Sequence, residues 1–244
     1  MPPPFQDLDP KADPPEFARL LSRFPFERKV TSVHLHHTWR PRRDQWRGRE
    51  TLRTLWYTHT LQFGWSDIAQ HLTIDPDGQA WTGRSWNRPP CSCPNENGTR
   101  AAGPFMITVL GDFNRDGDRF DGAQYEQTVD IIARVHSRFG LGDDTLRFHR
   151  DLDPSPTTRC PGDVDRGVLV KAVSARRAAL ENGLEPSREK GGTSPFSEDA
   201  EAWYQFITIS NQSGVLLEDE PASYPQDLGD LLIGAEESGR RKPR

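Results

Sequence analysis

The chain has 244 residues, a formal net charge of −5 and a mean hydropathy of −0.78. This length is enough to bury one core and to carry appendages. No apolar run approaches the roughly 18 residues that would predict a membrane-spanning helix, and the net charge does not predict nucleic-acid binding. The three cysteines are an odd number, and two of them stand in Cys91-Ser92-Cys93. They do not predict a disulfide framework, so synthesis in a reducing cytosol fits better.

The first part of the chain predicts an arm, a helix and a strand. Residues 1–14 are rich in proline and predict an extended arm, and residues 17–24 have the spacing of a short amphipathic helix docked on a core. The start of the chain lacks the basic and apolar regions of a Sec signal peptide, so we expect none. Residues 28–37 alternate as a strand does, and the arginine-rich residues 40–49 predict an exposed loop.

The middle of the chain alternates between helix and strand patterns. Apolar residues recur at helical spacing in 50–63, 124–139 and 164–180. Short strands are predicted at 71–74, 79–83, 105–110 and 145–148, and the first two are joined by the turn signal Asp75-Pro76-Asp77-Gly78. Residues 85–104 lack any period and predict a long loop. This order predicts an α/β or α+β fold in one domain, with an arm and helix at 1–26 and the domain at 27–182.

Residues 183–244 have a different character. Residues 183–198 combine glycine, serine, proline and charge, as linkers do. Residues 202–217 regain apolar side chains and are compatible with a short helix or a hairpin, and the acidic remainder predicts a mobile tail. A docking or regulatory role for this segment stays open beside that interpretation.

The stretch from Phe148 to Asp163 holds a histidine and a cysteine, His149 and Cys160, on a loop with two prolines. Imidazole and thiolate together favour zinc, provided that a third ligand comes from elsewhere. The predicted strand upstream offers three histidines. His34 and His36 share one face of it and His37 lies on the other, so this pattern alone leaves the choice of third ligand open.

The order of the motifs along the chain resembles that of the zinc-dependent type 2 N-acetylmuramoyl-L-alanine amidases, which include phage lysozyme-type amidases and peptidoglycan recognition proteins. The matching segments, spread over about residues 30–175, are Leu35-His36-His37-Thr38, Gly64 to His71, Ile74 to Gly78, Thr82-Gly83-Arg84, Leu110-Gly111-Asp112-Phe113, His149-Arg150-Asp151 and Cys160-Pro161-Gly162-Asp163. The resemblance implies a central mixed β-sheet flanked by helices, a Zn²⁺ cofactor and a peptidoglycan or muropeptide substrate. The implied reaction is hydrolysis of the amide bond between N-acetylmuramic acid and L-alanine of the stem peptide.

Carried over position by position, the resemblance makes His36, His149 and Cys160 the zinc ligands, with His34 as the rival for His36. Thr158 matches a position that helps to stabilise the tetrahedral oxyanion. Gln70 stands where many active relatives carry a tyrosine that positions or deprotonates the attacking water. A glutamine amide can hydrogen-bond water but cannot act as a base.

The identity of the base is therefore open. A second branch of the family carries a glutamate on the central strand, where this chain has Thr108 and no acid. Asp67, Asp112 and Asp151 are the nearby carboxylates, and the sequence does not place any of them at the site. The activity expected is that of the amidase. The alternative is a weakly active or non-catalytic module of the same fold that binds or senses peptidoglycan.

Several further features have a weaker interpretation. The candidates to line a sugar-peptide groove are Trp39, Trp81, Arg84, Trp86 and Asn87. We interpret Cys91 and Cys93 as loop thiols without a special role, and Asn97-Gly98-Thr99 as an unused glycosylation sequon. The expected place of synthesis is the cytoplasm, with action on the cell wall after export or lysis or on recycled muropeptides. Nothing in the sequence predicts the oligomeric state.

Overall fold

The computed structural model describes residues 14–153 and 158–183. The proline-rich arm, apart from Pro14, lies outside the described residues. The linker, the apolar segment 202–217 and the acidic tail predicted after Gly183 also lie outside them.

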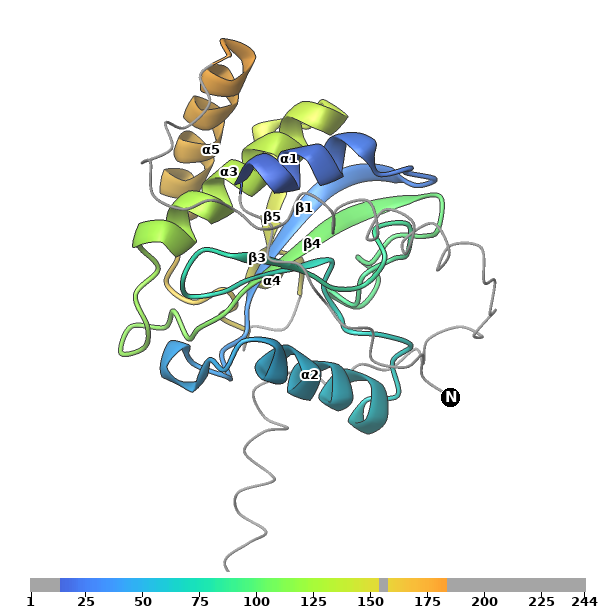
Figure 1. Cartoon of the computed structure of the whole chain (residues 1–244), viewed down its shortest axis with the longest axis vertical. Coiled ribbons are helices and arrows are strands. Elements are labelled where there is room, and N and C mark those ends of the chain that lie inside the picture. Colours follow the sequence, from blue (N-terminus) through green and yellow to red (C-terminus); the bar gives the residue numbers. More distant parts are fainter. Residues whose placement is uncertain (1–13, 154–157, 184–244) are drawn as a thin grey trace, which may run out of the picture.

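A five-stranded sheet in the order β3-β2-β4-β1-β5 forms the centre of the fold (Figure 1). Its strands are β1 (Lys29–His37), β2 (Leu72–Ile74), β3 (Ala80–Thr82), β4 (Ala102–Val109) and β5 (Leu146–Phe148). β1 runs parallel to both β4 and β5, β2 runs parallel to β4, and β3 runs antiparallel to β2. The expected central mixed sheet in an α/β fold is thus confirmed.

Helices cover the two faces of the sheet unequally. On one face lie α1 (Pro14–Arg23), α3 (Gly122–Phe139) and α5 (Arg166–Glu181), and on the other lies α2 (Arg49–Tyr57) (Figure 1). Shorter turns complete the chain: the 3₁₀ helices Arg43–Gln45 and Asp143–Thr145, the π-helical turn Thr58–Gln62 after α2, and the four-residue helix α4 (His149–Leu152). The segment predicted as one helix at 50–63 is therefore an α-helix that widens into a π-turn.

The alternation of side chains along the strands separates the core from a polar face. Val33 and Leu35 of β1 and Ile107 of β4 are buried in the main apolar core, together with residues of α1, α3 and α5. The residues between them point to the face that α2 covers, since successive strand side chains alternate. These are His34 and His36 on β1 and Met106 and Thr108 on β4, and His36 is the register partner of Thr108.

Candidate metal centre

The three predicted ligands come from neighbouring elements. His36 lies near the carboxyl end of β1, and His149 follows directly after β5. Since β1 and β5 are adjacent and parallel, their carboxyl ends meet at the same edge of the sheet. Cys160 returns to this edge from the loop after α4. The ligand atoms of the three residues all lie within 4.8 Å of one another.

The spacing fits a tetrahedral zinc site. His36 Nδ1 lies 3.6 Å from Cys160 Sγ. A nitrogen and a sulfur on one tetrahedral zinc ion are expected about 3.5 Å apart, given Zn–N near 2.05 Å and Zn–S near 2.3 Å. The other ring nitrogen of His36, Nε2, lies 2.8 Å from Ser92 Oγ, and His149 Nε2 lies 3.7 Å from Asp153 Oδ2. In His36, Nδ1 is therefore the nitrogen that faces Cys160 and could bind a metal.

The surroundings favour the ligand forms that a metal needs. Burial, followed by the neighbouring His149, holds the pKa of His36 well below 6.5, so its imidazole stays neutral. The backbone N–H of His37 points at Cys160 Sγ at 3.4 Å, which favours a thiolate. His37 itself accepts a hydrogen bond from the backbone N–H of Phe113 through Nδ1. This contact gives His37 a structural role.

Arg150 fastens the loop that carries Cys160. Its backbone N–H donates to the carbonyl of Cys160 at 2.9 Å, and its guanidinium donates to the carbonyls of Gly162 and, at 2.7 Å, of Val164. Gly162 has φ +78°, and a Cβ there would lie 2.4 Å from the backbone of Phe113. The loop can approach the strand end this closely only because residue 162 is glycine.

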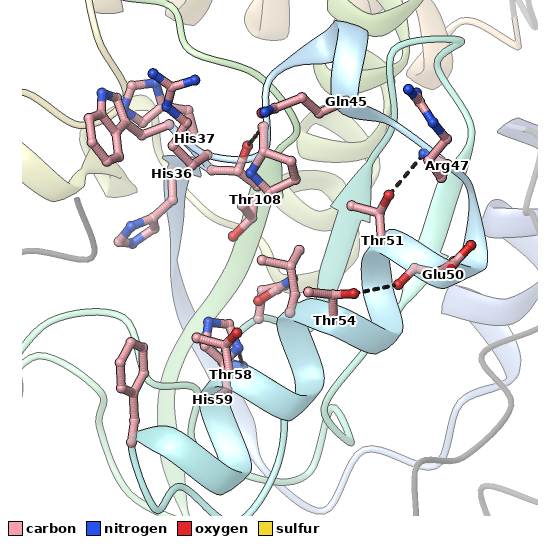
Figure 2. A pocket seen from close by; sticks show the side chains of 18 of the residues that line it. His36, His37, Gln45, Arg47, Glu50, Thr51, Thr54, Thr58, His59 and Thr108 are labelled. Atoms are coloured by element: carbon pink, nitrogen blue, oxygen red, sulfur yellow. Dashed lines mark hydrogen bonds between the residues drawn. The ribbon is translucent and has the colours of Figure 1, made fainter. Parts of the chain in front are cut away.

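A cavity of about 620 Å³, lined by the candidate ligand His36, lies between the sheet and α2 (Figure 2). His36, His37 and Thr108 lie on its sheet side. Thr51, Thr54 and Glu50 line the opposite wall along α2 (Figure 2). The cavity thus reaches the candidate metal site at His36, and two threonine hydroxyls stand on its helical wall.

Two residues that line the cavity, Gln70 and Thr108, occupy the positions where relatives carry a candidate general base. Gln70 is buried and donates a hydrogen bond from Nε2 to Thr73 Oγ1 at 2.8 Å. Thr108 is 6% exposed, and its Oγ1 has no hydrogen-bond partner among the described residues. Thr73 pairs with Thr108, which pairs with His36 across β2, β4 and β1. A row of polar side chains therefore crosses the sheet beside the metal centre.

The three aspartates considered as general bases form hydrogen bonds or ion pairs with other residues of the fold. Asp67 accepts hydrogen bonds from Trp56 Nε1 and the backbone N–H of Ile68. Asp112 pairs with Arg42 at 2.7 Å, and Asp151 accepts from the backbone N–H of Phe148. None of the three lines the cavity. The carboxylate that does so, among the described residues, is Glu50.

The predicted groove residues divide into two groups. Trp39 lines the cavity. Trp86 is 2% exposed and packs against the rings of Phe17, Phe24, Phe26 and Phe105. Trp81 is buried and donates to Asp75 at 2.9 Å. We therefore correct the prediction that the two buried tryptophans line a groove.

The polar groove candidates need the same correction. Arg84 is 3% exposed, and its guanidinium donates to the carbonyls of Asp67, Ile68 and Pro89. Asn87 is 7% exposed and ties its loop to the carbonyl of Pro25 and the N–H of Glu27. Both side chains bond mainly to main-chain groups, because the buried polar groups of an aperiodic loop need partners that no regular element supplies.

Thr158 lies apart from the large cavity. It borders a second hollow with Arg150, Arg159, Gly162, Asp163 and Val164. It stands two residues before Cys160, as its predicted role as an oxyanion donor requires. That role remains a proposal.

Reasoning from the sequence missed the contacts of Ser92 and Arg150. Arg150 had a local signal, because it follows a ligand directly within His-Arg-Asp. Ser92 had none, since its loop is 56 residues from His36 and has no period. Only the fold brings Ser92 to the metal centre.

A family model described as N-acetylmuramoyl-L-alanine amidase matches residues 26–163, which is more than half of the chain. The chain belongs to this amidase family. The match includes the three candidate ligands, Gln70 and Thr158. The membership supports peptidoglycan as the material on which the chain acts or to which it binds.

Solved structures of amidases and recognition proteins are similar to this amidase-family chain. Drosophila PGRP-LB matches at 21% identity with a TM-score of 0.47, covering 69% of this chain and 88% of that one. The endolysin amidase LysCS from Clostridium intestinale URNW matches at 20% identity with a TM-score of 0.48, covering 72% and 94%.

A curated protein, the argininosuccinate synthase of Maricaulis maris (strain MCS10), is 32% identical over 115 residues, 46% of this chain and 26% of that protein. The amidase-family chain thus spans about a quarter of the length of this curated relative. No helix of the described residues is long and apolar enough to cross a membrane.

Proposed function

We propose that the chain is a zinc-dependent hydrolase that cleaves the amide bond between N-acetylmuramic acid and the L-alanine of the stem peptide. The observation that carries the proposal is the meeting of His36, His149 and Cys160, of which His36 also lines a cavity of about 620 Å³. Three protein ligands leave a fourth position open, as catalytic zinc sites do.

The imidazole and thiolate groups of His36, His149 and Cys160 are ligand types that zinc prefers, and their spacing suits one zinc ion. Zinc held by these residues would lower the pKa of a bound water toward about 7 and polarise the amide carbonyl. The chain's own residues would do the rest. The cavity between the sheet and α2 would hold the stem peptide, with Trp39 on its wall. Thr158 would donate a hydrogen bond to the oxyanion, a contribution of a few kcal/mol if it is preorganised.

The position of the attacking water would depend on hydroxyl and amide groups. Gln70 cannot accept a proton, and its Nε2 already donates to Thr73. Thr108 offers a buried hydroxyl that has no partner in the described part of the chain, on the cavity side of β4 and in register with His36. We propose that this hydroxyl hydrogen-bonds the water or the substrate. A rate below that of relatives with a true base, by on the order of 10²–10⁴, is expected.

Digestion of peptidoglycan tests the proposal. Purified protein loaded with zinc should release new L-alanine amino termini, and Cys160→Ala, which removes one ligand, should not. Absence of new termini from the zinc-loaded protein, or equal release by the two proteins, would contradict it.

Gln70 favours a second candidate function, a module that binds peptidoglycan with little or no turnover. This function needs the cavity but not the metal chemistry. Saturable muropeptide binding that survives Cys160→Ala, without turnover by the zinc-loaded protein, would favour it. Rapid turnover would eliminate it.

A further inference from the structure

Ser92, in the loop between β3 and β4, lies between two histidines of β1. Its Oγ is 2.8 Å from His36 Nε2 and 2.9 Å from His34 Nδ1. The far nitrogen of His34, Nε2, lies 3.2 Å from Ser32 Oγ. Ser92 is 7% exposed and both histidines are 2% exposed, so these contacts form inside the protein.

Metal binding at Nδ1 of His36 fixes the direction of its hydrogen bond to Ser92. A ring that gives the lone pair of Nδ1 to a metal carries its hydrogen on Nε2, and that Nε2–H must donate to Ser92 Oγ. The serine hydroxyl has one hydrogen, and the other partner of Ser92 Oγ among the described residues is Nδ1 of His34. The hydrogen bonds are therefore all satisfied when the serine donates to this nitrogen. His34 then carries its own hydrogen on Nε2 and donates it to Ser32. The opposite direction would put a hydrogen on His36 Nδ1 and block the metal.

The protein holds the serine in place independently of the metal. The side-chain oxygen of Asn97 accepts the backbone N–H groups of Ser92 at 2.6 Å and of Cys93 at 3.1 Å. The guanidinium of Arg28, which is 2% exposed, donates to the carbonyls of Asn97, Thr99 and Pro104. These bonds tie the loop from residue 91 to residue 99 to the sheet. They hold the Ser92 side chain in position against β1.

We propose that Ser92 is a positioning residue of the metal centre: together with His34 it fixes the ring orientation and tautomer of His36. His34 is then part of the support for a ligand, and both of its nitrogens are used for it. The inference rests on the proposed function, because it assumes that His36 binds the metal. It assigns a role to the middle residue of Cys91-Ser92-Cys93 and to the first histidine of the β1 cluster.

Zinc affinity of the whole chain, measured by competition with a chelator, tests the proposal without reference to activity. Ser92→Ala should bind zinc about 10–100-fold more weakly, the usual effect of removing a hydrogen-bond partner of a ligand histidine. Ser85→Ala, in the same loop but outside the metal site, should bind as the parent chain does.

Pairing the change with one at His34 distinguishes positioning from general damage to the loop. His34→Phe keeps a ring and removes both nitrogens. If the two residues act as one unit, the double variant should lose about as much affinity as Ser92→Ala alone, because the losses do not add. Additive losses would contradict a joint role of the two residues.

A spectroscopic measurement keeps the proposal testable if the zinc affinity of a variant is lowered by poor folding. With cobalt in place of zinc, the ligand-field spectrum should change for Ser92→Ala and stay unchanged for Ser85→Ala. Equal zinc affinity and an equal cobalt spectrum for Ser92→Ala and the parent chain would overturn the role of Ser92 alone. If the parent chain bound no zinc, the proposed function would fail as well, so the two failures are distinguishable.

Discussion

At Thr108 a buried hydroxyl has no hydrogen-bond partner within residues 14–153 and 158–183, a feature that costs stability. Buried polar atoms in native proteins almost always find partners, and the exceptions call for an explanation. Thr108 borders the cavity and lies in register with a candidate metal ligand. An unpaired hydroxyl here is explained if its partner is the substrate or the water that attacks it.

Thr108→Val keeps the shape of the side chain and removes the hydroxyl. We expect the free energy of unfolding to stay constant or to rise by about 1 kcal/mol, since no hydrogen bond is lost. We expect kcat/KM on peptidoglycan to fall tenfold or more, equivalent to about 1.4 kcal/mol. Urea unfolding and steady-state rates measure the two effects.

Thr73→Val is the matched control on the neighbouring strand. It removes the acceptor of the Gln70 amide, so it should lower the free energy of unfolding by about 1–3 kcal/mol. A Thr108→Val variant with unchanged kcat/KM would exclude a role for its hydroxyl in the reaction.

The elements around the metal centre differ in how far the sequence predicts them. Strand and helix periods place β1, β4, β5, α3 and α5 to within a few residues, because each buries one apolar face or stripe. Periods do not describe loops. The loop between β3 and β4 turns Trp86 into the core and Ser92 toward the candidate metal site. Which of its side chains points inward depends on partners far away in the chain.

The segment from Cys160 to Val164 is held by Arg150. Arg150→Ala removes the guanidinium bonds to Gly162 and Val164, so Cys160 should be held less tightly. We expect zinc affinity to fall about tenfold or more, as for other residues that support a ligand. Arg159→Ala, an exposed change in the same loop, should have no effect. Equal zinc affinity for the two variants would contradict this role.

Over the whole molecule, buried neutral histidines should make the fold sensitive to acid. Burial lowers the pKa of His59 and His71 to about 3, and burial, followed by Arg177, lowers that of His136 to about 4. Below about pH 6.5 the unfolded chain takes up protons at these rings while the folded chain does not. Stability should therefore fall as the pH drops from about 6.5 toward 4.

Urea unfolding of the metal-free protein at several pH values measures this loss. Each such histidine contributes up to about 1.4 kcal/mol per pH unit. His136→Leu removes a buried ring whose two nitrogens have no partner among the described residues, so it should raise stability and flatten the pH dependence. A urea midpoint that is constant between pH 7 and pH 5 would contradict the account.

At this scale the sequence predicts the family and the ligand set, because both depend on short motifs in a fixed order. It does not predict which polar residues face the cavity. Arg84 and Asn87 satisfy main-chain groups, whereas Thr108, a neutral side chain in an apolar run, borders the metal centre. The outcome is set by strand register and by competition for hydrogen-bond partners, and neither can be read from local sequence.

Mass spectrometry of peptidoglycan digested by the zinc-loaded protein tests the central claim most directly, since the products identify the bond that is cut. The account predicts stem peptides that begin with an unmodified L-alanine and glycan strands with free lactyl carboxylates, and neither product after zinc is removed. Cleavage at a glycosidic bond or within the stem peptide, or an undigested sample, would contradict it.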